Sequence, residues 1–307
     1  MKHTLVGHTG FVGGNLAAGH TFDAMYHSTD IEESFGADNG LVIYSGMPSE
    51  KFLANADPAA DLAVAEKAMD NIRKMRPEQL VLISTVDVYP RPFGVYEDTA
   101  VHSEEMPAYG KNRRALEDWV RQAFPEALIV RLPGLFGKGL KKNFIYDMLT
   151  IIPMMLREDR FEQLSKKNPL VRACYAKDEA GFYRLEAEQT QREELKAFFE
   201  NNDFNALSFT DSRSVFQFYN LANLWTDLSR CLKMNLRLMN LATEPVEAGA
   251  LYKALFGEEF VNYLDRPPAF YDVRTHYGRE FGGDDDYVAD RDEVLAGIGK
   301  FVRTMIS

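Results

Sequence analysis

Three glycines spaced three residues apart constrain the start of this chain more than any other feature. Gly7, Gly10 and Gly13 follow the short apolar run 4–6, and helix-like sequence with Leu16 on its apolar face comes after them. This order predicts a strand, a tight turn and a helix. In such a turn one glycine permits the bend, one lets the backbone approach a pyrophosphate, and one lets the helix pack close to the strand. The helix N-terminus would then face the phosphates, whereas a glycine-rich turn without a ligand is the plain alternative.

The run Gly7-His8-Thr9-Gly10-Phe11-Val12-Gly13 resembles the signature Gly-x-Thr-Gly-Phe-(Ile/Val)-Gly of the NAD-dependent epimerase/dehydratases, the extended short-chain dehydrogenase/reductase family. The resemblance covers residues 1 to about 140 well and 208–245 moderately. It implies an α/β fold, a Rossmann-like doubly wound parallel sheet with a smaller C-terminal substrate-binding part. We expect the dinucleotide-binding domain in 1–140 and 206–245, and the smaller part in 141–205 and 246–307. In the turn, the resemblance implies cofactor contacts from Gly7, Thr9, Gly10, Phe11, Val12 and Gly13.

The choice between NAD and NADP depends on the sequence Tyr26-His27-Ser28-Thr29-Asp30, which follows the expected second strand at 21–26. Asp30 is able to accept a hydrogen bond from a ribose 2′-hydroxyl, which indicates NAD. His27, Ser28 and Thr29 would instead surround a 2′-phosphate, which indicates NADP. Both alternatives stay open, and the absence of an arginine here favours NAD.

Two further strands end in residues that the resemblance places at the cofactor and the reacting atoms. The apolar run 41–44 leads into Ser45 and Gly46, small residues expected against the cofactor. The run 80–83 leads into Ser84-Thr85-Val86-Asp87-Val88-Tyr89, which resembles the family's Ser-Ser/Thr-x-x-Val-Tyr. By that match Thr85 is the catalytic hydroxyl and Ser84 contacts the cofactor. The dehydratase subgroup has an Asp-Glu pair where this chain has Val86-Asp87, so the match disfavours dehydration.

A helical stretch beginning near residue 108 carries the expected acid/base. Tyr109 and Arg113 are four residues apart, so they lie one above the other on a helix. The family motif is Tyr-x-x-x-Lys, and Arg113 stands at the lysine position. An adjacent cation lowers the pKa of a tyrosine, which suits acid/base chemistry on an alcohol. Arginine supplies the charge and is able to bind a ribose, but it does not release a proton. An exposed surface pair is the alternative.

Three more positions complete the expected site. The buried strand at 127–133 ends at Pro133, in a turn against which the family lays its nicotinamide. Asn143 follows at a position where the family often has polar residues facing the substrate. Arg213 matches an arginine that meets the diphosphate in sugar-nucleotide enzymes, because its forked geometry suits phosphate. Residues 150–205 match no motif of the family, and we expect a solvated helical insertion there.

Composition narrows the possible partners. The net charge of −11 disfavours nucleic acid, which requires a basic face. No apolar run approaches the roughly 20 residues that span a bilayer, and a strand at the start leaves no room for a signal peptide, so no membrane partner is expected. Two cysteines, Cys174 and Cys231, fit a reducing cytoplasm better than a disulfide scaffold. The six histidines form no metal-binding motif, so we expect no metal.

Together these features predict an NAD(P)-dependent oxidoreductase or epimerase that acts on a nucleotide-activated sugar by reversible hydride transfer. Tyr109 would be the acid/base, Thr85 would share the hydroxyl, and Arg113 would hold the ribose. The alternative is a catalytically degenerate NAD(P)-binding sensor or partner protein of the same fold, which the arginine at position 113 supports. The family also pairs its tyrosine-bearing helix in a four-helix dimer interface, so we expect a homodimer with Trp119 and Val120 on that surface.

Overall fold

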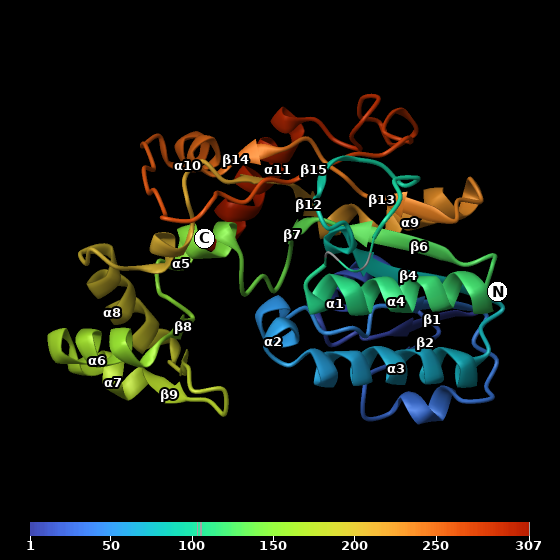
Figure 1. Cartoon of the computed structure of the whole chain (residues 1–307), viewed down its shortest axis with the longest axis horizontal. Helices are drawn as coiled ribbons and strands as arrows, with labels where there is room; N and C mark the ends of the chain where they lie inside the picture. The colour runs from blue at the N-terminus through green and yellow to red at the C-terminus, as the bar shows by residue number, and fades with distance from the viewer. Residues whose placement is uncertain (103, 105, 307) are drawn as a thin grey trace. The chain divides into compact units, whose positions relative to one another are not determined.

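The computed structural model describes residues 1–102, 104 and 106–306, and its centre is a six-stranded parallel sheet in the order β13-β6-β4-β3-β1-β2 (Figure 1). The strands are β1 (His3–Val6), β2 (Ala24–Tyr26), β3 (Leu41–Tyr44), β4 (Gln79–Thr85), β6 (Leu128–Leu132) and β13 (Leu238–Asn240). The chain passes from β1 to β2 at one edge and then returns to β3 on the other side of β1. The strand order therefore reverses at β1, and open α/β sheets bind ligands at such a switch point. The Rossmann-like doubly wound α/β fold predicted from the sequence is confirmed.

Alternation along the strands builds one hydrophobic layer on each face of the sheet. Leu5 and Ile43 lie in a core cluster with residues of the helices α1 (Phe11–Gly19) and α9 (Leu224–Lys233). Val6 and Val42, their neighbours in sequence, lie in a second cluster with residues of α3 (Pro58–Met75) and α4 (Ala108–Ala123). Successive side chains of a strand point to opposite faces, so a strand covered on both faces is apolar throughout. The glycine turn precedes α1 and Tyr109 lies in α4, so the two sequence motifs are held by helices that pack on opposite faces of the sheet.

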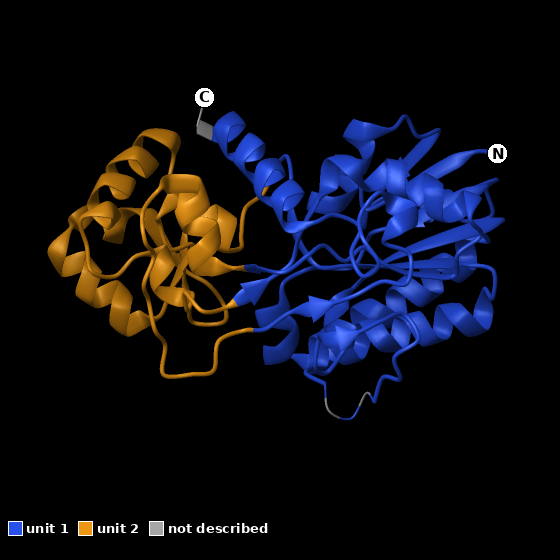
Figure 2. Ribbon diagram, turned by 90° about the horizontal axis from the view of Figure 1, so that it is seen from above, with its two compact units in different colours: residues 1–139, 215–246, 270–307 blue, residues 140–214, 247–269 orange. Residues whose placement is uncertain are grey.

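The chain divides into two compact units (Figure 2). Unit 1 comprises residues 1–139, 215–246 and 270–307, and unit 2 comprises 140–214 and 247–269. These limits differ from those expected, because the C-terminal segment 270–307 is part of unit 1. Besides the elements named above, unit 1 contains η1 (Ile31–Ser34), α2 (Lys51–Ala56), η2 (Val86–Val88), β5 (Phe93–Val95), β7 (Gly134–Phe136), β11 (Val215–Phe216), β12 (Phe218–Asn220), η5 (Leu221–Asn223), β15 (Asp272–Val273), η6 (Arg279–Phe281) and α11 (Arg291–Ile306), and β14 (Val246–Glu247) lies at its boundary.

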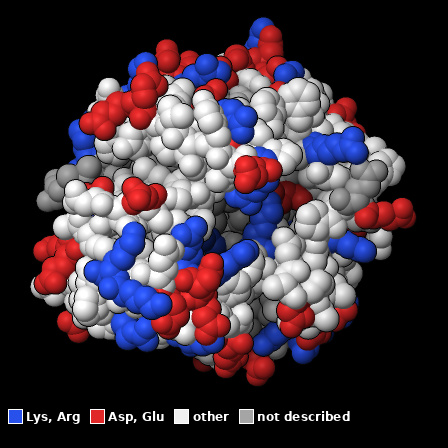
Figure 3. Space-filling model, turned by 60° about the vertical axis from the view of Figure 1, so that its left-hand side comes forward, with Lys and Arg blue, Asp and Glu red and all other residues white. Residues whose placement is uncertain are grey.

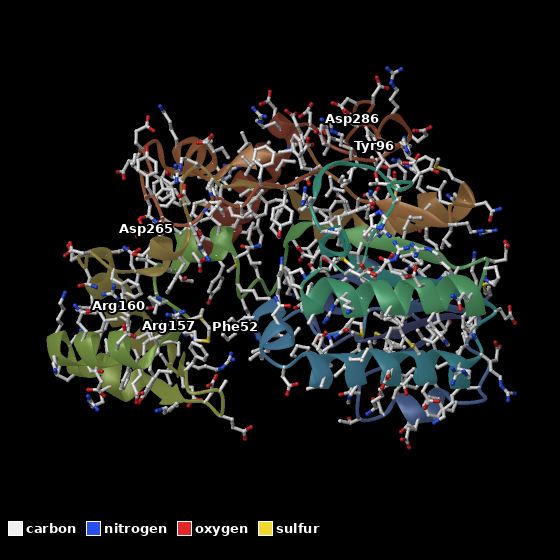
Figure 4. All side chains as sticks on the ribbon, viewed as in Figure 1. Phe52, Tyr96, Arg157, Arg160, Asp265 and Asp286 are labelled. Carbon is white, nitrogen blue, oxygen red and sulfur yellow. The ribbon has the colours of Figure 1, made fainter. Side chains whose placement is uncertain are left out.

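Strand pairing and polar contacts explain why the C-terminal segment belongs to unit 1. β15 pairs in parallel with β5. The hydroxyl of Tyr96 donates a hydrogen bond of 2.6 Å to Asp286, and the two residues are labelled close together in Figure 4. Arg274 donates to Asp286 at 3.2 Å. The segment after residue 269 is thus fastened to the loop that follows β4, and it contributes Tyr271 to the region where β4 ends.

Unit 2 has a hydrophobic core of its own. Its helices are α5 (Phe144–Thr150), α6 (Glu158–Lys167), α7 (Pro169–Cys174), α8 (Gln189–Glu200), η4 (Ala206–Phe209) and α10 (Ala248–Phe256), and its antiparallel sheet has the order β8-β10-β9, formed by Met155–Leu156, Tyr183–Leu185 and Tyr175–Lys177. Phe161, Val171, Leu195 and Phe199 are almost completely buried within it. The expectation of a merely solvated helical insertion at 150–205 was therefore wrong, because the amphipathic helices bury their apolar faces on this sheet.

Candidate functional site

The glycine turn has the close backbone packing that a dinucleotide site requires. Gly7 has a φ of +89°, which favours glycine, and a Cβ on Gly13 would lie 2.2 Å from the carbonyl oxygen of Gly7. Gly10 is the N-cap residue of α1 and makes no side-chain cap, so it leaves the helix N-terminus open to a phosphate. The buried Nδ1 of His8 has no hydrogen-bond partner among the described residues. This open cradle and the unpartnered nitrogen fit a bound pyrophosphate.

Neighbouring strands and loops surround this turn. The Oγ of Ser45 donates to the carbonyl oxygen of Val6 at 2.7 Å, and a Cβ on Gly7 would lie 2.7 Å from the carbonyl oxygen of Ser45. Asn15 of α1 exchanges two hydrogen bonds with the backbone of Lys138, at 2.9 and 3.1 Å. These contacts bring the turn after β3 and the loop after β7 against the glycine turn. Among the remaining expected cofactor residues, Thr9 and Gly46 are exposed, and Phe11, Val12 and Pro133 are half-buried.

The carboxylate of Asp30 already has a partner. Its Oδ1 accepts the backbone amide of His27 at 2.7 Å, and its Oδ2 lies 3.1 Å from the Nε2 of the same histidine. The His27 ring also lies 5.4 Å, between ring centroids, from that of His8 in the glycine turn. A ribose hydroxyl that binds Asp30 would therefore share the carboxylate with His27. The end of β2 therefore presents both a carboxylate, which suits the ribose hydroxyl of NAD, and the imidazole of His27, which suits the 2′-phosphate of NADP. Both cofactors stay open at this position.

Thr85 and Tyr109 meet at the carboxyl end of β4. The side chain of Thr85 lies close enough to the hydroxyl of Tyr109 to act on the pKa of that phenol. Thr85 is the last residue of β4, and its Oγ1 also accepts the amide of Asp87 at 3.2 Å. The amide of Tyr109 donates to Oδ1 of Asn55 in α2 at 2.9 Å, which fixes the start of α4. Two hydroxyl groups thus lie near one another where β4 ends, at the edge of the sheet where such folds bind ligands.

Burial keeps the proton on Tyr109. The loss of solvent around this phenol raises its pKa above the ordinary value, and the nearby carboxylate of Asp87 raises it further. Arg113, Lys51 and the side chain of Thr85 act in the opposite direction, but they do not outweigh burial. Arg113 lowers the pKa of Tyr109 as expected, but burial outweighs the arginine and the net shift is upward. At neutral pH the phenol of Tyr109 therefore carries its proton.

Arg113 is a buried structural cation. Its Nη1 donates to Oδ2 of Asp61 at 2.5 Å, and its Nη2 donates to the carbonyl oxygen of Pro48 at 2.7 Å. The guanidinium lies 3.8 Å from the centroid of the Tyr109 ring, so it packs on the face of the phenol. Asn112 also donates to Asp61, at 2.8 Å. The arginine thus fastens the Tyr109 helix to α3 and to the turn after β3, and its charge is balanced by Asp61.

The side chain of Ser84 is hydrogen-bonded within a buried polar network. Its Oγ donates to Oε1 of Glu117 at 2.7 Å, and Glu117 forms a buried pair with Arg131 at 2.6 Å. The pKa of Glu117 is lowered in spite of its burial, because Arg131 and further donors hold the charged form. Arg131 also donates to the hydroxyl of Tyr89 at 2.6 Å. This network joins β4, α4 and β6, so the hydroxyl of Ser84 contributes to the framework beneath the expected cofactor position.

Sequence reasoning missed a second polar cluster beside Tyr109. Lys51 of α2 donates to Asp87 at 2.7 Å and to the hydroxyl of Tyr271 at 3.1 Å. The charges of Lys51 and Asp87 both act on the Tyr109 phenol. Asp87 was noted only as half of a dehydratase pair, and no local signal connects it with residues 36 positions earlier and 184 positions later. The group adds an ammonium, a carboxylate and a second phenol to the site.

The two expected substrate residues lie in unit 2. Asn143 is the N-cap of α5, and its Oδ1 accepts the amide of Tyr146 at 3.2 Å. Arg213 is half-exposed, donates twice to Asp211 at 2.9 and 2.7 Å, and lies 4.9 Å from the centroid of the Tyr263 ring. The guanidinium of Arg213 holds the pKa of Asp211 well below its usual range. Arg213 is therefore accessible, but one edge of its fork is already occupied.

The prediction that both Trp119 and Val120 lie on a dimer surface is wrong for Val120. Val120 is completely buried in the core between the sheet and α4, so it offers no surface to a second subunit. Trp119 is half-buried, under Arg73 and beside Phe124.

Among the described residues, no cluster of three or more histidine, cysteine or acidic side chains is arranged to hold a metal. Within the same residues, every helix is too short or too polar to cross a bilayer.

Comparison with known proteins supports the fold. No family model and no curated protein sequence matches the chain. Solved structures of sugar-nucleotide enzymes match it over almost its whole length. A UDP-galactose 4-epimerase matches with a TM-score of 0.58 and 13% identity, covering 100% of this chain and 99% of its own.

Two further solved structures carry cofactors. A dTDP-4-dehydrorhamnose reductase from Bacillus anthracis in complex with NADP matches with a TM-score of 0.59 and 14% identity, and each chain is covered to 99%. The enzyme WbmG from Bordetella bronchiseptica in complex with NAD matches with a TM-score of 0.64 and 14% identity, covering 99% of this chain and 94% of that one. At these identities the similarity shows that the chain shares the fold of these three proteins.

Proposed function

We propose that the chain is an NAD(P)-dependent enzyme that reduces a carbonyl carbon of a nucleotide-activated sugar, or catalyses the reverse oxidation. The pair of hydroxyl groups of Tyr109 and Thr85, at the end of β4 and within the same unit as the glycine turn, is the observation that carries this proposal. The open helix N-terminus and the unpartnered His8 nitrogen fit the pyrophosphate of a dinucleotide. Similar solved structures are named as sugar-nucleotide epimerases and reductases, which supports the substrate class.

The residues of the chain supply the proton chemistry. A bound nicotinamide supplies or accepts the hydride. In the reductive direction Tyr109 donates its phenolic proton to the carbonyl oxygen as the carbon is reduced, and Thr85 stabilises the oxygen with a hydrogen bond. In the oxidative direction the tyrosinate takes the proton from the alcohol. Because burial raises the pKa of Tyr109, the phenol carries at neutral pH the proton that the reductive direction requires. Epimerisation requires both directions in turn.

For the cofactor, we propose NAD or NADP and slightly prefer NAD. The preference depends on Asp30 and on the absence of arginine around it. His27 and Thr29 are the residues that would meet a 2′-phosphate instead. Solved structures with this fold are titled as complexes with NAD and with NADP, so they support a nicotinamide cofactor of either kind. Titration of the purified protein with NADH and NADPH, followed by cofactor fluorescence, decides between them.

Turnover of a 4-keto sugar nucleotide tests the proposed reaction. The assay follows NADH and NADPH oxidation with dTDP- and UDP-linked 4-keto hexoses. Tyr109→Phe preserves the ring but removes the transferable proton, so it should lower turnover by about 10²–10⁴-fold. Circular dichroism controls for folding. Wild-type turnover by a folded Tyr109→Phe variant would show that the assigned mechanism is wrong.

A second candidate is a sensor or partner protein that binds NAD(P) without catalysis. It is favoured by Arg113, whose guanidinium is engaged with Asp61 and Pro48 and does not release a proton. Retention of a dinucleotide by the wild-type protein, without turnover of any sugar nucleotide, would favour this candidate. Mass spectrometry of ligands retained through purification is the direct observation.

The proposal also includes a cytoplasmic homodimer that binds neither nucleic acid nor membranes. In the face shown in Figure 3, basic and acidic side chains are interspersed, which fits a small-molecule enzyme better than a nucleic-acid surface. The net charge of −11 agrees with this choice. The half-buried Trp119 on α4 is the residue of the expected dimer surface that retains some exposure.

A further inference from the structure

Three side chains from distant parts of the chain form a closed hydrogen-bonded group. The Nζ of Lys51 lies 2.7 Å from Oδ1 of Asp87 and 3.1 Å from the hydroxyl of Tyr271. The hydroxyl of Tyr271 in turn lies 3.0 Å from the same carboxylate oxygen. Lys51 comes from α2, Asp87 from η2, and Tyr271 from the residue before β15. We call this group the Lys51 cluster.

The Lys51 cluster adjoins the Tyr109 phenol through two backbone contacts. Lys51 and Asn55 are four residues apart on α2 and therefore lie on one face of that helix, and Asn55 accepts the amide of Tyr109. A Cβ on Gly110 would lie 2.1 Å from the carbonyl oxygen of Asp87, so α4 packs directly on the backbone of η2. Because of this packing, the charges of Lys51 and Asp87 reach the hydroxyl of Tyr109. The other charged groups around that phenol are Arg113 on its own helix and Asp61, which pairs with Arg113.

The Lys51 cluster also lines a cavity of about 100 Å³. The walls are formed by the three cluster residues and by Tyr89, Pro90, Pro92, Pro107 and Gly110. Pro107 and Gly110 lie two residues before and one residue after Tyr109 in sequence, so the cavity is close to the backbone that carries the proposed acid/base. Its volume accommodates a few water molecules or one polar edge of a small ring.

The charges of the cavity select the kind of group that binds there. Asp87 repels an anion, Lys51 repels a cation, and an apolar group would remove water from the three polar side chains without replacing its hydrogen bonds. A pair of neighbouring hydroxyl groups satisfies all three, because each hydroxyl both donates and accepts. The ring faces and prolines of the wall suit the C–H groups of such a ligand. The cavity therefore fits a neutral polyol.

We propose that the Lys51 cluster is the subsite that selects the sugar, by binding neighbouring hydroxyl groups of its ring next to the carbon that reacts. Asp87 accepts hydrogen bonds from the hydroxyls, and Lys51 and Tyr271 donate to their oxygens. This inference rests on the proposed function, and it places sugar recognition in unit 1 rather than only at Asn143 and Arg213. The nucleotide then binds elsewhere, so sugar and nucleotide are separable contributions to affinity.

Calorimetry on the full-length protein with NADH bound tests the subsite without any turnover. The probes are UDP-glucose and dTDP-glucose, each compared with UDP or dTDP alone. Lys51→Met should lower the affinity gained from the glucosyl group about tenfold or more, since a hydrogen bond from a charged donor is lost. Its affinity for the nucleoside diphosphate alone should not change. Lys111→Met, at an exposed position of α4, is the matched control and should change neither value.

A protein–ligand double-mutant cycle sharpens the assignment. Tyr271→Phe and Asp87→Asn are compared with the wild type on the glucosyl nucleotide and on analogues that lack a single ring hydroxyl. If the subsite is correct, one deoxy analogue binds the wild type more weakly, and it loses little further affinity in the variants. If the variants leave the glucosyl contribution unchanged, the subsite is refuted while the proposed function stands. If neither sugar nucleotide nor nucleoside diphosphate binds the wild type, both the function and the subsite are refuted.

Discussion

Replacing Arg113 with methionine should destabilise unit 1 by about 3–5 kcal/mol, because it leaves a buried carboxylate without its cation. The side chain of Arg113 is 4% exposed and that of Asp61 is 6% exposed. The substitution removes hydrogen bonds from the guanidinium to Asp61 and to the carbonyl oxygen of Pro48. Each hydrogen bond from a charged donor contributes about 1.5–3 kcal/mol, so two of them give about 3–6 kcal/mol, which overlaps the range expected from the unpaired carboxylate. Asn112 would remain as a neutral donor to Asp61.

Urea unfolding followed by tryptophan fluorescence measures this loss in the right part of the molecule. The chain has two tryptophans, Trp119 and Trp225, and both lie in unit 1. A shift of the midpoint at constant slope reports a change in the free energy of unfolding. Lys74→Met is the control on α3, since Lys74 pairs with Asp70 at an exposed position and such pairs contribute about 0–1 kcal/mol.

A double variant separates loss of the pair from loss of one partner. Asp61→Leu combined with Arg113→Met replaces both charges by apolar groups, which is often neutral for a buried pair. The double variant should therefore be more stable than Arg113→Met alone, with a coupling energy of about 1–3 kcal/mol. The reasoning fails if Arg113→Met costs less than about 1 kcal/mol, or if the two single effects simply add.

Three further outcomes are expected. Burial raises the pKa of Asp147 to about 7. The pKa of an aspartate in the unfolded chain is about 3.9, so the wild type loses stability as the pH rises from about 4 to 7. In thermal melts at pH 8, Asp147→Asn should therefore be more stable than the wild type, by at most about 4 kcal/mol. At pH 4 the variant should show no gain in stability. Gly10→Val should abolish NAD(P)H binding in a folded protein, while Gly14→Ala should preserve it; unchanged fluorescence titrations for Gly10→Val would exclude a pyrophosphate at this turn. The wild type should sediment as a homodimer at micromolar concentration, and a monomer there would count against the family-type interface.

The sheet was predictable because its strands have a simple physical signature. Strands covered on both faces are continuous apolar runs, and the run 41–44 became β3 with the same bounds. The glycine turn was recognisable because its spacing reflects backbone contacts a few residues apart. The pair of Thr85 and Tyr109 followed from two motifs of the resemblance, which link positions that no local pattern joins. The sheet and the glycine turn were therefore predictable, because their sequence patterns are repeated along a strand or span only a few residues.

Long-range polar contacts were not predictable in this way. Lys51 lies in an unremarkable polar stretch, and its partner Tyr271 is 220 residues away. In the sequence, Asp61 is one of several acidic residues of an amphipathic helix, and only the structure shows that it pairs with Arg113. The core of unit 2 was missed because its helices are strongly charged, and their buried faces become evident only when they pack on a small sheet. Such contacts depend on tertiary packing, for which a single sequence holds no periodic signal.

The bonding of Arg113 bears on how this position changes during evolution. A lysine there has one compact ammonium, which is unable to match the forked contacts to Asp61 and to the carbonyl oxygen of Pro48 together. A single substitution of lysine for Arg113 would thus weaken the anchorage of α4. We expect homologues to change positions 61 and 113 jointly, with an acid at 61 wherever arginine is at 113. The two positions are then constrained together, because the arginine needs the acid as its buried counter-ion.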